Sequence, residues 1–274
     1  MFTLRPDQPV AHELLLIVRD RLDSAIDLLP IEGSLSPEVI HQLRKRFKRL
    51  RALFRLVHGF DEAAASQELI RYRDLGRDLS FSRDRDVMEQ SLIKLQFLTD
   101  DADVISRLEL LHRRVERQKL DSPATAATVK LEDLRGRLLE ARAAAEQILR
   151  GEYSNRQLVD GYLHTYSKSR KLCRLLPDSR VQEDWHDWRK RVKDDWYQTQ
   201  LLTLFRKDRP KKRLKKLRQL ADSLGCDHDL QNLSDMIETL TVRPHPLDEE
   251  ILSLLDRQRF DLQNQCLSLG QKLY

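Results

Sequence analysis

Apolar residues recur at spacings of three and four along most of the chain, and this periodicity constrains the fold more than any other feature. One such stretch runs through Ile40, Leu43, Phe47, Leu50, Phe54 and Val57. The spacing places these side chains on one face of an α-helix, and no segment alternates with the period of two that a half-buried strand requires. Only eight glycines and nine prolines interrupt the 274 residues. The sequence therefore predicts an all-α protein with long helices.

Capping signals place several helix starts. Ser36 and Ser122 each precede a proline, and a capping side chain before a proline is typical of the first helical turn. Ser154 and Gln157 have the spacing of a capping box. With the periodicity, these signals predict helices over residues 8–29, 37–58, 62–79, 83–99, 101–119, 123–150, 155–174, 180–206, 210–224, 227–240 and 247–270.

The chain also contains an internal repeat. A block that begins at His41 aligns with one that begins at His186, and five basic or histidine positions coincide: His41 with His186, Arg44 with Arg189, Lys45 with Lys190, Arg46 with Arg191, and Lys48 with Lys193. A second block at Phe81 aligns with Leu224, and in the helix before it Arg73 falls on Lys216. We therefore expect one domain over residues 1–274, made of two related halves at 7–150 and 151–270.

Basic side chains of the first block share one helix face. At about 100° per residue, an arc of about 80° beside the apolar stripe contains His41, Arg44, Lys48, Arg51 and Arg55. Like charges stacked in this way repel one another unless an anion or carboxylates lie opposite. The net charge is only +5, so the partner must be inferred from where the bases cluster.

The second block carries a shorter basic face. His186, Arg189 and Lys193 lie at the corresponding positions, but Trp196 and Gln200 replace the last two arginines. A chain of phosphates suits such rows, because arginine can bridge phosphate oxygens and lysine supplies a mobile charge. Histidine adds a donor whose charge depends on pH, so we expect affinity to rise as pH falls, through His41 and His186.

A structural explanation competes with ligand binding at these residues. The basic stripes could pair with carboxylates of other helices, with Asp84, Asp86, Asp227 and Asp229 as the candidates. A stacking platform for nucleic-acid bases is conceivable at the three tryptophans, Trp185, Trp188 and Trp196, but core packing explains their helical spacing better.

The sequence favours binding over catalysis. It contains no Walker loop, no nucleophile elbow, no H-E-x-x-H and no E-x-E-x-K motif, and the H-x-x-R spacing does not match metal ligands. We therefore predict no metal and no cofactor. The three cysteines are far apart and the first ten residues lack the pattern of an export signal, so we expect a reducing cytoplasm and no membrane span.

The residues between positions 7 and 267 resemble the conserved-histidine α-helical domain, CHAD. The runs 41–53 and 186–193 look like the two histidine helices of that family. Residues 224–229 look like its L-G-x-x-H/N-D element, and 85–87 like its first R-D element. This sequence departs from the family at Asp194, Asp195 and Trp196, and at Phe81 and Ser82, where leucine and glycine are usual.

The resemblance implies two antiparallel four-helix bundles, related by a pseudo-twofold axis, with a basic cavity between them that binds inorganic polyphosphate without catalysis. It also implies an association with polyphosphate granules. From the residues and the resemblance together, the predicted polyphosphate ligands are His41, Arg44, Lys45, Lys48, Arg51, Arg55, Arg73, Arg85, His186, Arg189, Lys190, Lys193, Lys216 and His228. Two alternatives stay open: a nucleic-acid-binding helical protein and a metal-dependent phosphohydrolase.

Overall fold

We analysed a computed structural model that describes the backbone of residues 2–79, 81–97, 99–121, 130–179, 181–205, 210–240 and 245–274, and the side chains of these residues except 81–88, 118–121 and 240. The predicted all-α fold is confirmed. The described residues form α1 (Val10–Ile26), α2 (Pro37–Leu56), α3 (Glu62–Asp78), α4 (Phe81–Gln96), α5 (Ala102–Asp121), α6 (Leu131–Ile148), α7 (Asn155–Leu175), α8 (Gln182–Leu201), the short 3₁₀ helix η1 (Thr203–Phe205), α9 (Lys211–Leu240) and α10 (Pro246–Gln271).

The capping signals read from the sequence set two helix starts. The Ser36 hydroxyl accepts a hydrogen bond from the backbone of Val39 at 3.3 Å, with Pro37 at the first position of α2. Ser154 and Gln157 form the predicted capping box at the start of α7. The third signal, at Ser122, lies outside the described residues, and α6 is described from Leu131 onward.

The expected break near Gly225 was wrong. Residues 210–224 and 227–240 were predicted as two helices, but α9 is continuous from Lys211 to Leu240. A glycine in a helix interior costs about 1 kcal/mol relative to alanine. Buried leucines on both sides of Gly225 offset this cost, since Leu220 and Leu224 pack in one core cluster and Leu233 in another.

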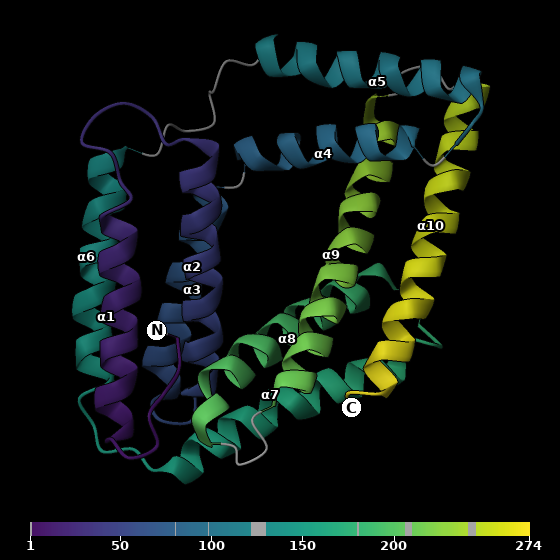
Figure 1. Cartoon of the computed structure of the whole chain (residues 1–274). Helices are drawn as coiled ribbons and strands as arrows, with labels where there is room; N and C mark the ends of the chain where they lie inside the picture. The colour runs from purple at the N-terminus through teal and green to yellow at the C-terminus, as the bar shows by residue number, and fades with distance from the viewer. Residues whose placement is uncertain are drawn as a thin grey trace.

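The helices pack in three groups around an open centre (Figure 1). In the first group α1, α2, α3 and α6 enclose a core that includes Phe47, Phe54 and Tyr72. In the second group α7 and α8 pack with α9 and α10 around Trp188, which is fully buried. The predicted core role of Trp185 and Trp188 is therefore confirmed.

The third group joins helices from distant parts of the sequence. Helices α4 and α5 pack against the C-terminal part of α9 and the N-terminal part of α10, with a core that includes Leu95, Leu108, Ile237 and Ile251. Thus α4 and α5 contact helices of residues 151–270, although they belong to the expected first half. No helix within the described part of the chain is long and apolar enough to cross a membrane.

The contact of α2 with α7 and α8 joins the first group to the second. The boundaries of α2 and α8 differ by 145 residues at both ends, which is the offset at which the histidine blocks align. The side-chain amide of Gln198 donates a hydrogen bond to the backbone carbonyl of Ala52 at 2.9 Å. A Cβ at Gly161 of α7 would collide with the carbonyl oxygen of Leu56, so only glycine allows this close approach.

We predict that Gly161→Ala lowers the free energy of unfolding by about 1 to 3 kcal/mol, because the added methyl group forces α7 away from α2. The matched control is Gly136→Ala in α6, where a Cβ meets open space. That substitution should raise stability by about 0.5 to 1 kcal/mol through helix propensity alone. Urea unfolding of both variants measures the difference, and equal changes of one sign would contradict the proposed close contact.

Candidate functional site: a basic cavity at the centre of the helices

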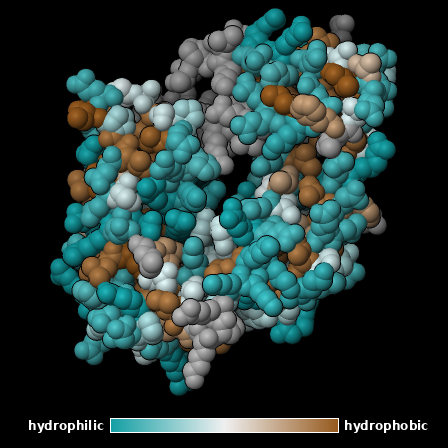
Figure 2. Space-filling view, in the orientation of Figure 1, coloured by the Kyte–Doolittle hydropathy of each residue, from teal (hydrophilic) through white to brown (hydrophobic). Residues whose placement is uncertain are grey.

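A cavity of about 890 Å³ lies between α2 and α3 on one side and α8 and α9 on the other. Figure 2 shows the hollow at the centre of the molecule, with mainly hydrophilic residues around it. Its lining contains ten lysines and arginines, two histidines and three aspartates. The basic lining residues are Arg44, Lys48, Arg51, Arg55, Arg73, Arg77, Arg189, Lys190, Arg191 and Lys193.

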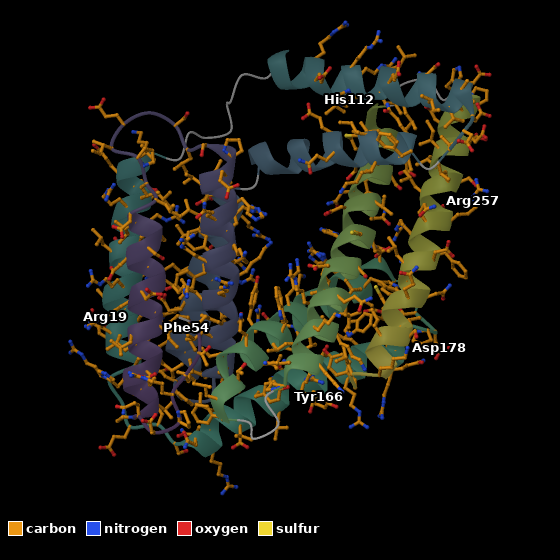
Figure 3. All side chains as sticks on the ribbon, viewed as in Figure 1. Arg19, Phe54, His112, Tyr166, Asp178 and Arg257 are labelled. Atoms are coloured by element: carbon orange, nitrogen blue, oxygen red, sulfur yellow. The ribbon has the colours of Figure 1, made fainter. Side chains whose placement is uncertain are left out.

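The α2 arginines stand on a rigid apolar floor. Phe47 and Tyr72 line the bottom of the cavity and are almost fully buried, and their rings stack with centroids 6.3 Å apart. Arg44 reaches across to α3 and donates a hydrogen bond to the carbonyl of Gly76 at 2.5 Å. The same apolar stripe that packs the first group therefore fixes the row of bases beside it. Figure 3 shows nitrogen-tipped side chains extending from α2 and α8 into this space.

Arg51 is a partly buried base of the row, one helical turn before Arg55. Burial lowers the pKa of its guanidinium, and the charge of Arg55 lowers it further, whereas Asp194 opposes the shift. The buried Nε of Arg51 has no hydrogen-bond partner among the described residues. A buried donor without an acceptor costs free energy, so this arginine is held in the wall at the expense of stability.

Asp194 is the buried counter-charge between the two basic helices. Its carboxylate accepts from Nη1 of Arg55 at 2.9 and 3.0 Å, and it lies 3.3 Å from Nη1 of Arg191. The side chain of Asp194 is 7% exposed and that of Arg55 is 17% exposed, so water screens the pair little. The ion pair links α2 to α8 and fixes two arginines at the cavity wall. In the sequence this aspartate is recognisable only as a departure from the family pattern.

Two histidines meet at the wall formed by α8 and α9. The rings of His186 and His228 have centroids 4.7 Å apart. Burial, and after it the positive surroundings of Arg189, His186, Lys193 and Lys190, lower the pKa of His228 to about 3. Burial also lowers the pKa of His186, as does Lys190, while Glu183 and Asp187 oppose the shift. Both rings are therefore neutral at neutral pH.

The candidate carboxylates of the structural explanation serve different partners. Asp227 is buried and accepts hydrogen bonds from Arg259 and Gln263 of α10, so it stabilises the second group and not the basic rows. Asp229 lines the cavity, together with Asp187, which pairs with Lys190 at 2.9 Å. The side chains of Asp84 and Asp86 lie outside the described residues.

Ten of the fourteen predicted ligands line the cavity: Arg44, Lys48, Arg51, Arg55, Arg73, His186, Arg189, Lys190, Lys193 and His228. His41 and Lys45 line a separate recess instead. Lys216 is exposed and does not line the cavity, because its position on α9 is rotated by about 120° from that of Asp222, which does. Arg85 belongs to α4, in a stretch whose side chains are not described.

The lining residues that sequence reasoning did not assign to the site include two arginines and an asparagine. Arg77 lines the cavity but was not among the predicted ligands, and Arg191 was aligned with Arg46 but not assigned to the site. Asn232 follows one turn after His228 on the same face of α9. Helical spacing from Arg73 and from His228 points to Arg77 and Asn232, but nothing in the sequence shows that Arg191 turns toward the cavity.

One group of potential metal ligands lies away from the cavity. Among the described residues, Glu89 of α4 and His112 and Glu116 of α5 place ligand atoms within 4.8 Å of one another. Figure 3 shows His112 on α5, on the far side of the open centre from α7 and α8. This group has no connection with the basic cavity.

The sequence matches the CHAD domain family over residues 27–238, and the chain therefore belongs to the CHAD domain family. The crystal structure of the CHAD domain from the plant Ricinus communis is similar, with a TM-score of 0.66 and 19% sequence identity, covering 96% of this chain and 88% of that chain. At this identity the likeness shows the fold. None of the curated proteins compared matches the chain in sequence.

We predict that Asp194→Asn destabilises the protein and strengthens the binding of phosphate anions. Loss of the charge leaves Arg55 and Arg191 without their buried counter-ion, which should cost about 3 kcal/mol of stability. The same loss makes the cavity more positive, so a polyphosphate should raise the melting temperature of the variant more than that of the wild type. Asp133→Asn is the control, because that carboxylate is 60% exposed, its pair with Arg137 is screened, and it does not line the cavity. Equal ligand-induced shifts in all three proteins would contradict this account.

Proposed function

We propose that the protein binds inorganic polyphosphate in the central cavity, without catalysis. The observation that carries this proposal is the lining itself, where ten lysines and arginines face three aspartates in one cavity. A linear chain of phosphates presents an anionic group every few ångströms, and arginine can grip successive oxygens in bidentate fashion. The family membership supports the proposal, because CHAD domains are associated with polyphosphate.

The cavity favours a phosphate chain over a nucleic acid. Sequence-tolerant binding of single strands relies on exposed aromatic rings on which the bases stack. The two aromatic lining residues with described side chains, Phe47 and Tyr72, are buried under the arginine row and offer no ring face to a base. If nucleic acid were the ligand, a short RNA would displace polyphosphate at comparable concentrations. A phosphate-release assay with polyphosphate and divalent cations tests the phosphohydrolase alternative.

Binding in the cavity suggests a cellular role as a polyphosphate-associated protein. A protein that holds a segment of a long polyanion would concentrate wherever that polymer accumulates, which includes polyphosphate granules. Imaging a fluorescently tagged chain in cells with and without polyphosphate synthesis tests this part of the proposal.

We predict that Lys48→Gln with Lys193→Gln weakens polyphosphate binding by about tenfold to a hundredfold, because each lysine supplies a charge-assisted contact. The double variant should also reduce the slope of log affinity against log salt by about 1.4, at roughly 0.7 per lost phosphate contact. The charge-matched control is Lys212→Gln with Lys216→Gln, at two exposed positions of α9 outside the cavity. Calorimetric titration at several salt concentrations compares them, and an equal loss in the control would place the ligand elsewhere.

We predict that affinity rises as pH falls from about 8 to about 6, by less than tenfold per pH unit for each histidine. Bound phosphate raises the pKa of His186 and His228, so binding takes up protons. In the absence of ligand, acidification destabilises the protein instead of favouring binding. The reason is that the pKa of His228 is about 3 in the folded protein, against an ordinary 6.5. Acidification below 6.5 therefore protonates the unfolded chain first and lowers the stability of the folded one.

The pH prediction is checked with His186→Gln and His228→Gln in calorimetry and thermal unfolding. The control is His12→Gln, because His12 is exposed on α1 and lines neither the cavity nor the separate recess. The two cavity variants should lose most of the pH dependence of binding to a long chain. If His12→Gln removed as much of it, the histidine pair would not be the proton acceptor.

A further inference from the structure

A second basic recess lies on the opposite side of α2 from the central cavity. It has a volume of about 390 Å³ and lies between α1 and α2. Its lining contains Arg21, Lys45, Arg46 and Arg49 together with His41 and Gln42, against one acidic residue, Glu38. The recess and the cavity share no lining residue. On α2, Arg46 is rotated by about 200° from Arg44, so one helix presents bases to two separate spaces.

The arginines of this recess are held in place before any ligand binds. Arg46 donates to the hydroxyl of Ser24 at 3.0 Å and to the carbonyl of Gln42 at 3.3 Å. The guanidinium groups of Arg21 and Arg49 each lie 5.6 Å from the centroid of the Phe2 ring, and Arg49 also lies 5.7 Å from the ring of Tyr197. Preorganised donors of this kind reduce the entropy that binding must overcome.

The end of the chain that carries Phe2 is itself anchored. The backbone nitrogen of Leu4 donates to the carbonyl of Leu201 at 2.9 Å, which ties the first residues to the end of α8. Phe2 is buried and packs edge-on against Tyr197, with ring centroids 6.5 Å apart. The aromatic floor beneath Arg21 and Arg49 is therefore a fixed part of the fold.

The three arginines are close enough to disfavour one another's charge. Burial lowers the pKa of Arg46, and the charges of Arg21 and Arg49 lower it further. Asp20 is the nearby carboxylate, 3.5 Å from Arg21, and its side chain is 55% exposed, so it compensates weakly. The buried Nε atoms of Arg21 and Arg49 have no hydrogen-bond partner among the described residues. An anion in the recess would supply the opposite charge that these arginines lack.

We propose that this recess is a second anion site, which binds a short condensed phosphate through Arg21, Arg46 and Arg49. Three guanidinium groups suit a phosphate group, which has several oxygens around one centre and accepts bidentate pairs. The recess has less than half of the volume of the central cavity, so it fits a short phosphate or the end of a chain better than a long segment. The rings of Phe2 and Tyr197 are covered by arginines, so no ring face is left for a nucleotide base.

The test is a calorimetric titration of the full chain with sodium tripolyphosphate. Three double variants are compared: Arg21→Gln with Arg46→Gln in the recess, Lys48→Gln with Lys193→Gln in the cavity, and Arg113→Gln with Arg114→Gln as a charge-matched control on exposed positions of α5. We expect two binding events in the wild type and in the control. The recess variant should lose one event, with an affinity lower by about tenfold or more, and the cavity variant should lose the other.

A second measurement does not depend on the variants folding. In the ¹⁵N-labelled wild type, tripolyphosphate should shift the Nε–H resonances of Arg21 and Arg49, whose Nε atoms are buried. A recess variant that titrates like the control, together with unshifted Nε–H resonances, would overturn the second site and leave the central cavity as the binding site. If instead the cavity variant titrates like the control while the recess variant loses binding, the proposed function of the cavity fails and the second site stands.

Repeating the titration with a long polyphosphate shows whether the recess binds free short phosphates alone or also the ends of long chains. If the recess variant weakens tripolyphosphate binding alone, the recess serves free short phosphates. If it weakens both ligands, the recess also holds the ends of chains. Both results support the site, and the absence of any effect of the recess variant on either ligand would exclude it.

Discussion

The basic cavity depends on the ion pairs that the buried carboxylate of Asp194 forms. This carboxylate lies where α2 meets α8 and contacts Arg55 from one helix and Arg191 from the other. Without a counter-charge at this point, two basic helices would repel each other across their contact. Gln198 and Gly161 add a hydrogen bond and a close backbone approach at the same junction. The junction thus brings the basic rows of α2 and α8 together, while Asp194 neutralises only the two arginines that it contacts, Arg55 and Arg191.

The rest of the cavity wall remains strongly positive, and this lowers the stability of the folded protein. Burial lowers the pKa of each of three groups in this wall, Arg51, Arg191 and His228. Each lowered pKa means that the fold disfavours the charged form of that group. A bound anion would favour the charged form. Stability and binding are therefore opposed in this region. The apolar stripe beneath the α2 row, with Phe47 fully packed, provides the rigid support that keeps the charges in place.

The sequence alone predicted most of the helices and most of the basic residues that line the cavity, because both follow from periodicity along single helices. His41 was assigned to the α2 row from its angle, but the structure places it with Glu38 in the other recess, near the start of the helix. Asp194 could not be assigned, since its partner Arg55 is 139 positions away and their meeting is a tertiary contact. Residue spacing predicts which side chains share a face of a helix, but it does not predict which other helix packs against that face.

The density of bases on α2 follows from its position between two spaces. Arg44, Lys48 and Arg51 face the cavity, whereas Arg46 and Arg49 face the recess beside α1. The apolar residues of the same helix point into the core of the first group. A helix that served the cavity alone would need bases only on one side of its apolar stripe. The bases on both sides therefore argue that α2 carries two anion-binding surfaces, which share a helix but no side chain.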